Sequence, residues 1–270
     1  MKVLLTNDDG IGAKGLHALR RALLEVPGIE LSVIAPDSNR SATARSITTR
    51  TPLTVEEVAL GDGTTGFATD GTPVDCVRFA ALGLVDPPDL IVSGINHGAN
   101  LGDDITYSGT VAAALEGVVL GIPAIAVSQQ SDRRKVDFRE GGEFDFEPVA
   151  AFAARIVEEL EEVPFPDDTL LNINAPAGEI TGARVCRLGK RIYHDQLELE
   201  SEDEDGRRVY RIYGRDPGYE EEEGTDFEAI AAGCIAVTPL HFDLTDEAGI
   251  EQLSGFELER LLRPAAREVE

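Results

Sequence analysis

Positive charge is scarce in this sequence. Lysine and arginine together number 24 against 50 aspartates and glutamates, only four of the basic residues are lysines, and the formal net charge is −26. A surface of this sign repels the phosphates of nucleic acids and of anionic membranes. We therefore expect neither polymeric DNA or RNA nor a membrane among the partners of this protein.

The same excess of negative charge makes the folded chain repel itself. Concentrated salt screens such repulsion, because the Debye length falls to about 3 Å at molar ionic strength. Our hypothesis is a salt-loving host, which predicts a higher melting temperature in molar potassium chloride than in dilute buffer. Thermal denaturation followed by circular dichroism in the two solutions tests this, and equal melting temperatures would refute it.

Cysteine is also rare. The three cysteines, Cys76, Cys186 and Cys234, are far apart, odd in number and outside any CxxC spacing. This pattern excludes a disulfide framework and a cysteine-based zinc site. We expect three buried free thiols.

Long apolar runs are missing as well. No segment approaches the roughly 20 apolar residues that span a bilayer. The opening residues MKVLLTNDDG place acidic groups directly after a short apolar run, unlike a secretory signal peptide. We therefore expect a cytoplasmic protein.

What the sequence does contain is an alternation of short apolar runs with segments of helical periodicity. Its 270 residues, 42% of them hydrophobic, are enough for one large α/β domain. Such alternation is typical of a parallel sheet with crossover helices. The expected strands are residues 2–6, 31–35, 90–93, 124–128 and 170–173, and the expected helices cover 18–23, 75–84, 111–120 and 149–160.

The pattern changes after about residue 181. Short β-like runs at 184–188 and 209–213 surround an acidic turn at 198–205, which indicates an extended hairpin. A hairpin of this kind serves either as an oligomerisation arm or as a solvated decoration, and both remain open. A strand at 234–238 and an amphipathic helix at 251–262 follow.

Two adjacent carboxylates, Asp8 and Asp9, directly follow the first expected strand. Oxygen ligands of this kind suit a hard divalent cation. An aspartate in this position can also cap the next helix, but capping explains one carboxylate and not two beside Asn7. The motif therefore favours a metal site.

The loop after the second strand, APDSNRSATARS, is rich in hydroxyls and carries Arg40 and Arg45 in a chain that is short of cations. It suits an anionic ligand, although a plain polar loop explains it equally well.

The stretch SGINHGANLGDDITYSGTVAAALEG follows the strand at 90–93 and leads into a helix that begins near Ser108, Gly109 and Thr110. The free N–H groups and the dipole of a helix N-terminus favour a phosphate, although an ordinary Ser/Thr cap also explains these residues. His97, within the stretch, is either a general acid or a solvated loop residue.

Three loops that follow parallel strands should meet at one edge of the sheet, where ligands of open α/β folds bind. Together they offer carboxylates, asparagines, hydroxyls and an anion-binding helix end, which is what metal-assisted phosphoryl transfer requires. No GxSxG motif supports acyl transfer.

Seven motifs resemble those of the SurE family of survival proteins, which are nucleoside monophosphate phosphatases. In order they are LLTNDDGIGAKG, APDSNRSA, GTPVDCV, SGINHGANLGDDITYSGTVAAALEG, LNINAP, GTDF and TPLHFDLT. The resemblance implies hydrolysis of nucleoside 5′-monophosphates, with 3′-monophosphates as a second candidate class, and one divalent cation, magnesium or manganese. It also implies a cytoplasmic homodimer or homotetramer.

In the fold that the resemblance implies, residues 1–180 form a Rossmann-like α/β catalytic core with a mostly parallel sheet flanked by helices. Residues 181–270 supply a β-hairpin arm and a C-terminal strand and helix, which complete the core or are exchanged with a partner subunit.

The resemblance also assigns site residues. Carried over position by position, the metal ligands are Asp8, Asp9, Ser41 and Asn96, with Asp8, Asp9 and Asn96 also acting in catalysis. The residues expected to contact the substrate are Asn39, Ser41, Ser108, Gly109 and Thr110. Two positions depart from the family pattern, because Ala42 replaces a common glycine and Lys14 a frequent proline. Alanine tolerates positive φ poorly, so the shape of the Ser41 loop is in question.

Two other functions fit the core pattern less well. An NAD-dependent dehydrogenase needs GxGxxG after the first strand, where this chain has Asn7-Asp8-Asp9-Gly10. A non-enzymatic, magnesium-binding receiver-like module needs an aspartate and a lysine at the ends of later strands. Here those strands run into Ser-Gly-Ile-Asn and Ser-Gln-Gln.

Overall fold

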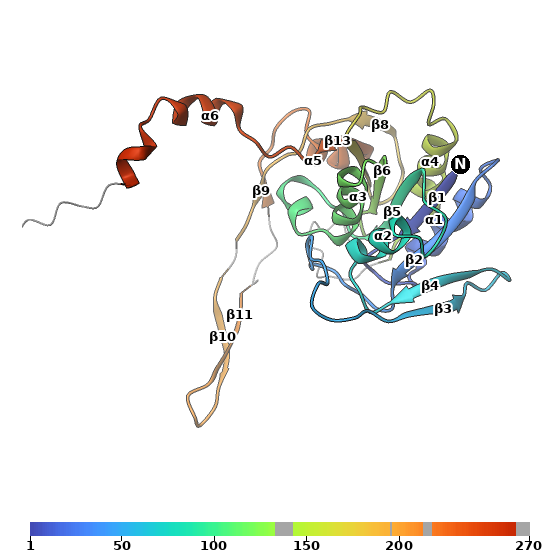
Figure 1. Ribbon diagram of the computed structural model, residues 1–270, viewed down its shortest axis with the longest axis horizontal. Coiled ribbons are helices and arrows are strands. Elements are labelled where there is room, and N and C mark those ends of the chain that lie inside the picture. Colours follow the sequence, from blue (N-terminus) through green and yellow to red (C-terminus); the bar gives the residue numbers. More distant parts are fainter. Residues whose placement is uncertain (133–142, 195, 213–217, 263–270) are drawn as a thin grey trace, which may run out of the picture.

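The computed structural model describes residues 1–132, 143–194, 196–212 and 218–262 (Figure 1). Its main sheet has nine strands in the order β3-β4-β2-β1-β5-β6-β7-β13-β8. The strands of this sheet are β1 (Lys2–Thr6), β2 (Glu30–Pro36), β3 (Val55–Ala59), β4 (Thr65–Thr69), β5 (Leu90–His97), β6 (Ala124–Gln129), β7 (Thr169–Ala175), β8 (Gly182–Val185) and β13 (Cys234–His241). The helices that pack on it are α1 (Lys14–Leu24), α2 (Pro73–Ala81), α3 (Gly109–Val119), α4 (Glu147–Glu158) and α5 (Asp226–Ala231), with a 3₁₀ turn, η1, at Gly102–Thr106.

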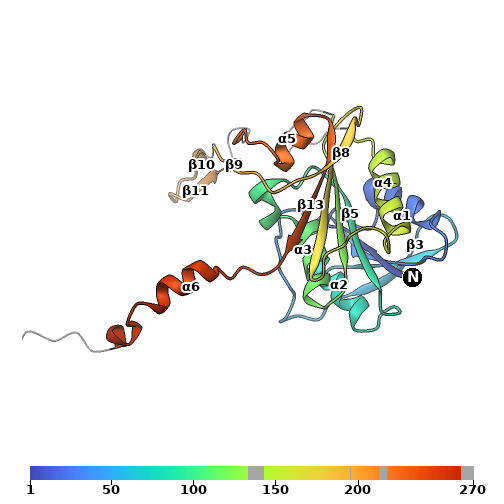
Figure 2. The same cartoon turned by 90° about the horizontal axis from the view of Figure 1, so that it is seen from above.

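The sheet is mostly parallel, as the sequence predicts. Strands β4, β2, β1, β5, β6 and β7 run in parallel, whereas β3 pairs antiparallel with β4 and β13 antiparallel with β7. Two layers of helices cover it, with α1 and α4 on one face and α2 and α3 on the other (Figure 2). The expected α/β core with a parallel sheet between helices is confirmed.

Strand β1 shows why the central strands read as unbroken apolar runs. Val3 and Leu5 point into the core under α1 and α4, while Leu4 points into the core under α2 and α3. Because successive side chains of a strand face opposite sides, a strand covered on both faces is apolar along most of its length. The three cysteines are free and buried, as expected.

The hydrophobic pattern placed most helices within a few residues but mistook some boundaries. Helix α2 begins at Pro73, because Thr72 caps it through a reciprocal capping box with Asp75. The expected C-terminal helix at 251–262 is instead two pieces, α6 (Glu247–Ser254) and a 3₁₀ turn, η2 (Leu258–Leu262). Gly255 lies at the end of α6, where the helix stops.

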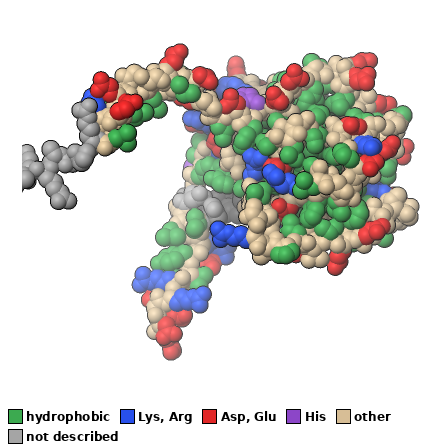
Figure 3. All heavy atoms as spheres, viewed as in Figure 1, with side chains coloured by type: hydrophobic (Ala, Val, Ile, Leu, Met, Phe, Trp, Pro, Cys, Tyr) green, Lys and Arg blue, Asp and Glu red, His purple; other side chains and the backbone are tan. Residues whose placement is uncertain are grey.

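The expected extended hairpin is present as β10 (Glu198–Glu202) and β11 (Arg208–Arg211), apart from the main sheet. Two further short strands, β9 (Arg191–Ile192) and β12 (Gly218–Tyr219), pair at its base. Both the hairpin and α6 project from the body of the molecule, and hydrophobic side chains are visible on each of them (Figure 3). The predicted run at 209–213 ends at Tyr213, which lies outside the described residues. Among the helices described, none has the length and apolar character needed to span a membrane.

Candidate metal and phosphate site

The loops after β2 and β1 meet the end of β5 at the carboxyl edge of these neighbouring strands. Ser41 and Asp8 lie on the two loops and Asn96 near the end of β5, and these three residues line one cleft. The start of α3 adds Ser108 to the same cleft. The sequence therefore predicted correctly that these four residues lie together, because the carboxyl ends of parallel strands share one sheet edge.

Asp8 is almost fully buried, with 3% of its surface exposed. Its Oδ1 accepts a 2.5 Å hydrogen bond from the Thr110 hydroxyl. A Cβ at position 109 would lie 2.7 Å from the Asp8 Cβ, so the close approach of α3 requires Gly109. Burial, and then the charge of Asp9, raise the pKa of the Asp8 carboxyl to about 6 against the opposing hydrogen bond from Thr110.

Asp9 is held by two donors from different loops. Its Oδ2 accepts from the His97 backbone N–H at 3.0 Å, and its Oδ1 accepts from the Asn39 amide at 3.1 Å. The Asn39 Oδ1 in turn accepts from the Ser41 backbone N–H at 2.9 Å. Burial raises the pKa of Asp9 to about 6, although these donors oppose the shift. Asn39 thus links two of the predicted metal ligands.

This carboxylate pair fits a divalent cation. Among the residues that the structure describes, neither Asp8 nor Asp9 takes part in an ion pair. Two partly desolvated, adjacent negative charges without a counter-ion are unfavourable, and a bound cation would offset that cost. The same described residues contain no group of three or more His, Cys, Asp or Glu that could hold a metal. A metal at this cleft would therefore also need neutral oxygens.

Asn96 and Ser41 offer such oxygens. The Asn96 side chain donates through Nδ2 to the Gly98 carbonyl at 2.7 Å, which leaves Oδ1 as its oxygen for a cation. Ser41 is exposed in the cleft wall. The two alanines that follow it, Ala42 and Ala44, adopt left-handed backbone angles with φ of 58° and 52°. Ala42 therefore adopts a backbone conformation that glycine tolerates better than alanine does.

The helix start at 108–110 is already engaged within the protein. The Ser108 hydroxyl caps α3 by accepting from the Val111 N–H at 3.1 Å, and the Thr110 hydroxyl is bound to Asp8. The interpretation of Ser108 as a helix cap is therefore confirmed. Contact with a phosphate would fall to the first backbone amides of α3, and it stays a prediction.

The interpretation of His97 as a solvated residue is wrong, because its side chain is half-buried at the cleft, while a role as general acid stays a prediction. Its imidazole stacks on Phe144 and Phe146, with ring centroids 5.2 and 4.9 Å away, and its Nε2 accepts from the Gly15 N–H at 3.2 Å. Burial lowers the pKa of this imidazole, which keeps it neutral near pH 7. The ring thus anchors the end of β5, where the His97 backbone N–H binds Asp9.

The two arginines of the Ser41 loop have partners within the protein, which is contrary to their suggested role as anion ligands. Arg40 binds the Asp37 carboxylate and the Asp70 and Gly71 carbonyls. Arg45 binds the Glu116 carboxylate. Both arginines brace the loop, and the sequence could not show this because most of their partners lie on other segments.

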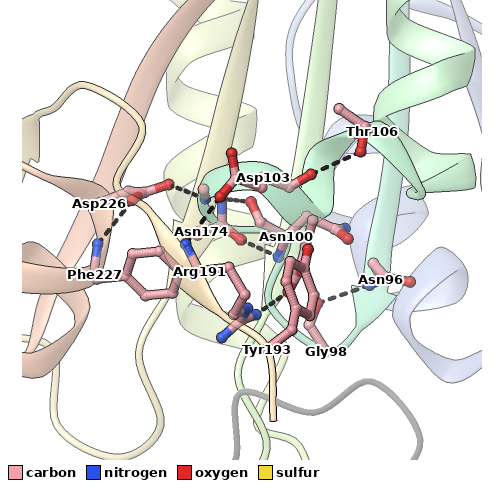
Figure 4. Close-up of polar contacts among 12 residues, drawn as sticks. Asn96, Gly98, Asn100, Asp103, Thr106, Asn174, Arg191, Tyr193, Asp226 and Phe227 are labelled. Atoms are coloured by element: carbon pink, nitrogen blue, oxygen red, sulfur yellow. Dashed lines mark hydrogen bonds and ion pairs between the residues drawn. The ribbon is translucent and has the colours of Figure 1, made fainter. Parts of the chain in front are cut away.

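A polar network behind the cleft was missed by the sequence interpretation (Figure 4). The Asp226 carboxylate accepts from the backbone N–H groups of Gly102, Gly189 and Phe227 at 2.8–2.9 Å. The Asn100 N–H donates to Asn174 Oδ1 at 2.7 Å. Asn174 lies in the motif LNINAP and Asp226 in the motif GTDF. These two motifs were the features of the sequence from which the network could have been predicted.

The cleft wall is also tied to the base of the hairpin. Asp104, which lines the cleft, pairs with the buried Arg191 and accepts from the Tyr193 hydroxyl at 2.9 Å. The Arg191 N–H binds Asp103 at 3.0 Å. Residues from the C-terminal third of the chain therefore fix the loop that follows Asn96.

Comparisons with known proteins agree on one family. A family model described as "Survival protein SurE" matches residues 3–195. The 5′-nucleotidase SurE of Rubrobacter xylanophilus is 53% identical and covers 97% of this chain and 99% of its own length. The 5′-nucleotidase SurE of Herpetosiphon aurantiacus is 46% identical over 94% of this chain and 97% of its own. The crystal structure of the SurE protein from Aquifex aeolicus is 38% identical, covers 96% of this chain and all of its own, and superposes with a TM-score of 0.77.

Proposed function

The chain belongs to the SurE family, and we propose on this premise that it is a metal-dependent 5′-nucleotidase. It hydrolyses nucleoside 5′-monophosphates to nucleoside and phosphate. One observation carries the proposal for this chain's own residues. Asp8 and Asp9 are adjacent carboxylates with no ion-pair partner among the described residues, and they sit at the sheet edge beside the N-terminus of α3.

The residues that would hold the cation are Asp8, Asp9, Ser41 through its hydroxyl and Asn96 through Oδ1. A divalent cation bound there supplies Lewis-acid chemistry and a lowered pKa for water. An all-oxygen donor set favours one magnesium or manganese ion over softer metals.

The protein itself supplies positioning. The His97 N–H and Asn39 hold Asp9, and Thr110 holds Asp8, so the carboxylates need little reorganisation. The Gly109 and Thr110 amides at the start of α3 stabilise negative charge on phosphate oxygens. A carboxylate with a pKa of about 6 can also accept the proton that an attacking water loses.

We expect phosphate release from nucleoside 5′-monophosphates only when magnesium or manganese is present. The assay is colorimetric phosphate release from the four common 5′-monophosphates and their 3′-isomers in molar potassium chloride. Addition of a chelator should abolish release, and excess manganese should restore it. Release that persists after exhaustive chelation would contradict the metal-dependent mechanism.

We further propose a homodimer or homotetramer in which residues 181–270 do two things. Strand β13 completes the subunit's own sheet next to β7, while the hairpin and the C-terminal segment pack on a second copy. This is supported by the exposure of apolar side chains there, among them Leu199, Val209, Ile250, Leu253 and Phe256. Exposed apolar patches of this kind are typical of protein–protein interfaces.

Leu253→Glu should therefore dissociate the oligomer, because it places a charge in the apolar face of α6. Sedimentation velocity should show the wild-type chain as a dimer or tetramer and the variant at a lower mass. Glu251→Gln on the same helix is the matched control, and it should keep the wild-type mass. A wild-type chain that sediments as a monomer would contradict the proposal.

We also place the protein in the cytoplasm. Three buried free thiols suit a reducing compartment, where thiols stay reduced. Labelling of these thiols after denaturation of freshly lysed cells should find all three free.

A further inference from the structure

One buried carboxylate outside the cleft joins three segments of the chain. Glu116, on the inner face of α3, has 1% of its side chain exposed. Its Oε2 lies 2.7 Å from Arg45 of the Ser41 loop, and its Oε1 lies 2.6 Å from Arg78 of α2. A buried charge of this kind is strongly coupled to its partners, since removing one leaves the other poorly compensated.

The loop that Arg45 belongs to is strained. Ala42 and Ala44, on either side of Thr43, both have left-handed φ angles. This conformation costs free energy for a residue with a Cβ, whereas glycine adopts it readily. The loop therefore needs contacts with the rest of the fold to hold it, and those contacts decide where Ser41 sits.

Two of these contacts lead to the segment that carries the helix start at 108–110. The Ala44 N–H donates to the Tyr107 carbonyl at 3.2 Å, and Arg45 reaches Glu116 two turns into α3. The Arg45 guanidinium also lies 4.4 Å from the centre of the Phe242 ring, which limits its freedom. The Ser41 loop is thus fastened to the same helix that holds Asp8 through Thr110.

We propose that Glu116, acting through Arg45, is a positioning residue that holds the strained loop so that Ser41 faces Asp8, and that it thereby sets the affinity for the divalent cation. This rests on the proposed metal site. Glu116 and Arg45 act at a distance and do not contact the substrate.

Arg78 provides a matched control within the same cluster. It binds the same carboxylate at nearly the same distance as Arg45, but it belongs to α2 and not to the Ser41 loop. Loss of either arginine removes one of the two positive charges beside Glu116, although only Arg45 also donates a hydrogen bond to it. Only loss of Arg45 releases the loop.

The sign of the electrostatic effect separates positioning from simple charge effects. Removal of a positive charge near a cation site should strengthen cation binding by Coulomb's law. Arg45→Gln is therefore decisive, since weaker binding in that variant must come from a displaced ligand. Glu116→Gln is supporting only, because removal of a negative charge would also weaken binding.

The test is a titration of the purified full chain with manganese, followed by electron paramagnetic resonance of the free ion, with no substrate present. Arg45→Gln should weaken manganese binding by about tenfold, within the range of couplings between contacting groups. Arg78→Gln should stay within about twofold of wild type, although it also removes a positive charge beside Glu116. Should Arg45→Gln not fold, Arg45→Lys, which keeps the charge but loses the guanidinium fork, serves in its place.

Rescue by glycine tests the strain itself. Ala42→Gly relieves the strain of the left-handed conformation and so makes the native shape of the Ser41 loop easier to adopt. The double variant Ala42→Gly/Arg45→Gln should therefore bind manganese more tightly than Arg45→Gln alone. Equal affinities for Arg45→Gln and Arg78→Gln, or no gain from Ala42→Gly, would overturn the inference. If instead wild type failed to bind manganese, or Asp9→Asn bound it as tightly as wild type, the proposed metal site itself would fail.

Discussion

Asp9→Asn should abolish phosphate release while leaving the fold intact. Both Asp9 oxygens accept hydrogen bonds, one from the His97 N–H and one from Asn39. An asparagine removes the charge and must turn its NH₂ group toward one of these donors. We expect kcat/KM to fall by about a thousandfold or more, which corresponds to about 4 kcal/mol of lost transition-state stabilisation.

The measurement is steady-state phosphate release at saturating manganese, with circular dichroism to show that the variant is folded. Asp89→Asn is the matched control, because Asp89 accepts from the Lys2 N–H at the other end of β1, far from the cleft. It should keep wild-type activity. Undiminished turnover in Asp9→Asn would remove Asp9 from the catalytic site.

Asp8→Asn should inactivate the enzyme and yet stabilise the metal-free protein. Asp8 has its pKa raised to about 6, above its value in the unfolded chain. Folding is therefore favoured when Asp8 is protonated. The stability that this protonation contributes is fully present below about pH 4 and is lost as the pH rises through 6. The difference of about two units between the pKa of Asp8 in the folded and the unfolded chain corresponds to on the order of 3 kcal/mol of folding stability lost at neutral pH.

An asparagine at position 8 is neutral at every pH and can still accept from the Thr110 hydroxyl. In a chelator at pH 8 its melting temperature should exceed that of wild type by roughly 5–10 °C, since 1 kcal/mol corresponds to about 2–4 °C in a chain of this size. The gap should narrow toward pH 5, as Asp8 becomes protonated.

Manganese should reverse the order of the two proteins. A cation that binds only the folded wild type stabilises it by mass action, whereas Asp8→Asn should gain little. Scanning fluorimetry at several pH values, with chelator and with manganese, measures all four states. A variant that melts below wild type in chelator at pH 8 would show that the Asp8 charge is already compensated within the fold.

Much of the core could be predicted from the sequence because its signals are local. Strands β1, β2, β5, β6 and β7 appear as apolar runs, since side chains on both faces are buried under helices. The topology of a parallel sheet then brings the loops after those strands to one edge, which is why Asp8, Ser41, Asn96 and Ser108 could be grouped in advance.

Other elements gave too weak a pattern. Strand β3 is at the edge of the sheet and β4 is next to it, and partly exposed residues in both strands obscure the alternation of apolar and polar positions. Helix α5 has six residues, too few for a helical period to stand out. The sequence analysis missed all three of these elements. Helix α5 nevertheless carries Asp226, which accepts a hydrogen bond from the Gly102 N–H in the segment after Asn96.

The amino-acid sequence by itself determined the layered α/β core and the gathering of oxygen-bearing side chains at one sheet edge, because periodicity and the order of strands are properties of short segments. Only the tertiary structure decided which partner each polar side chain takes. Arg45 pairs with Glu116, 71 residues away, and His97 is enclosed by Phe144 and Phe146. A loop arginine or histidine looks the same in sequence whether it faces a ligand or the protein, since hydrogen bonding and burial depend on neighbours that only the folded chain brings together.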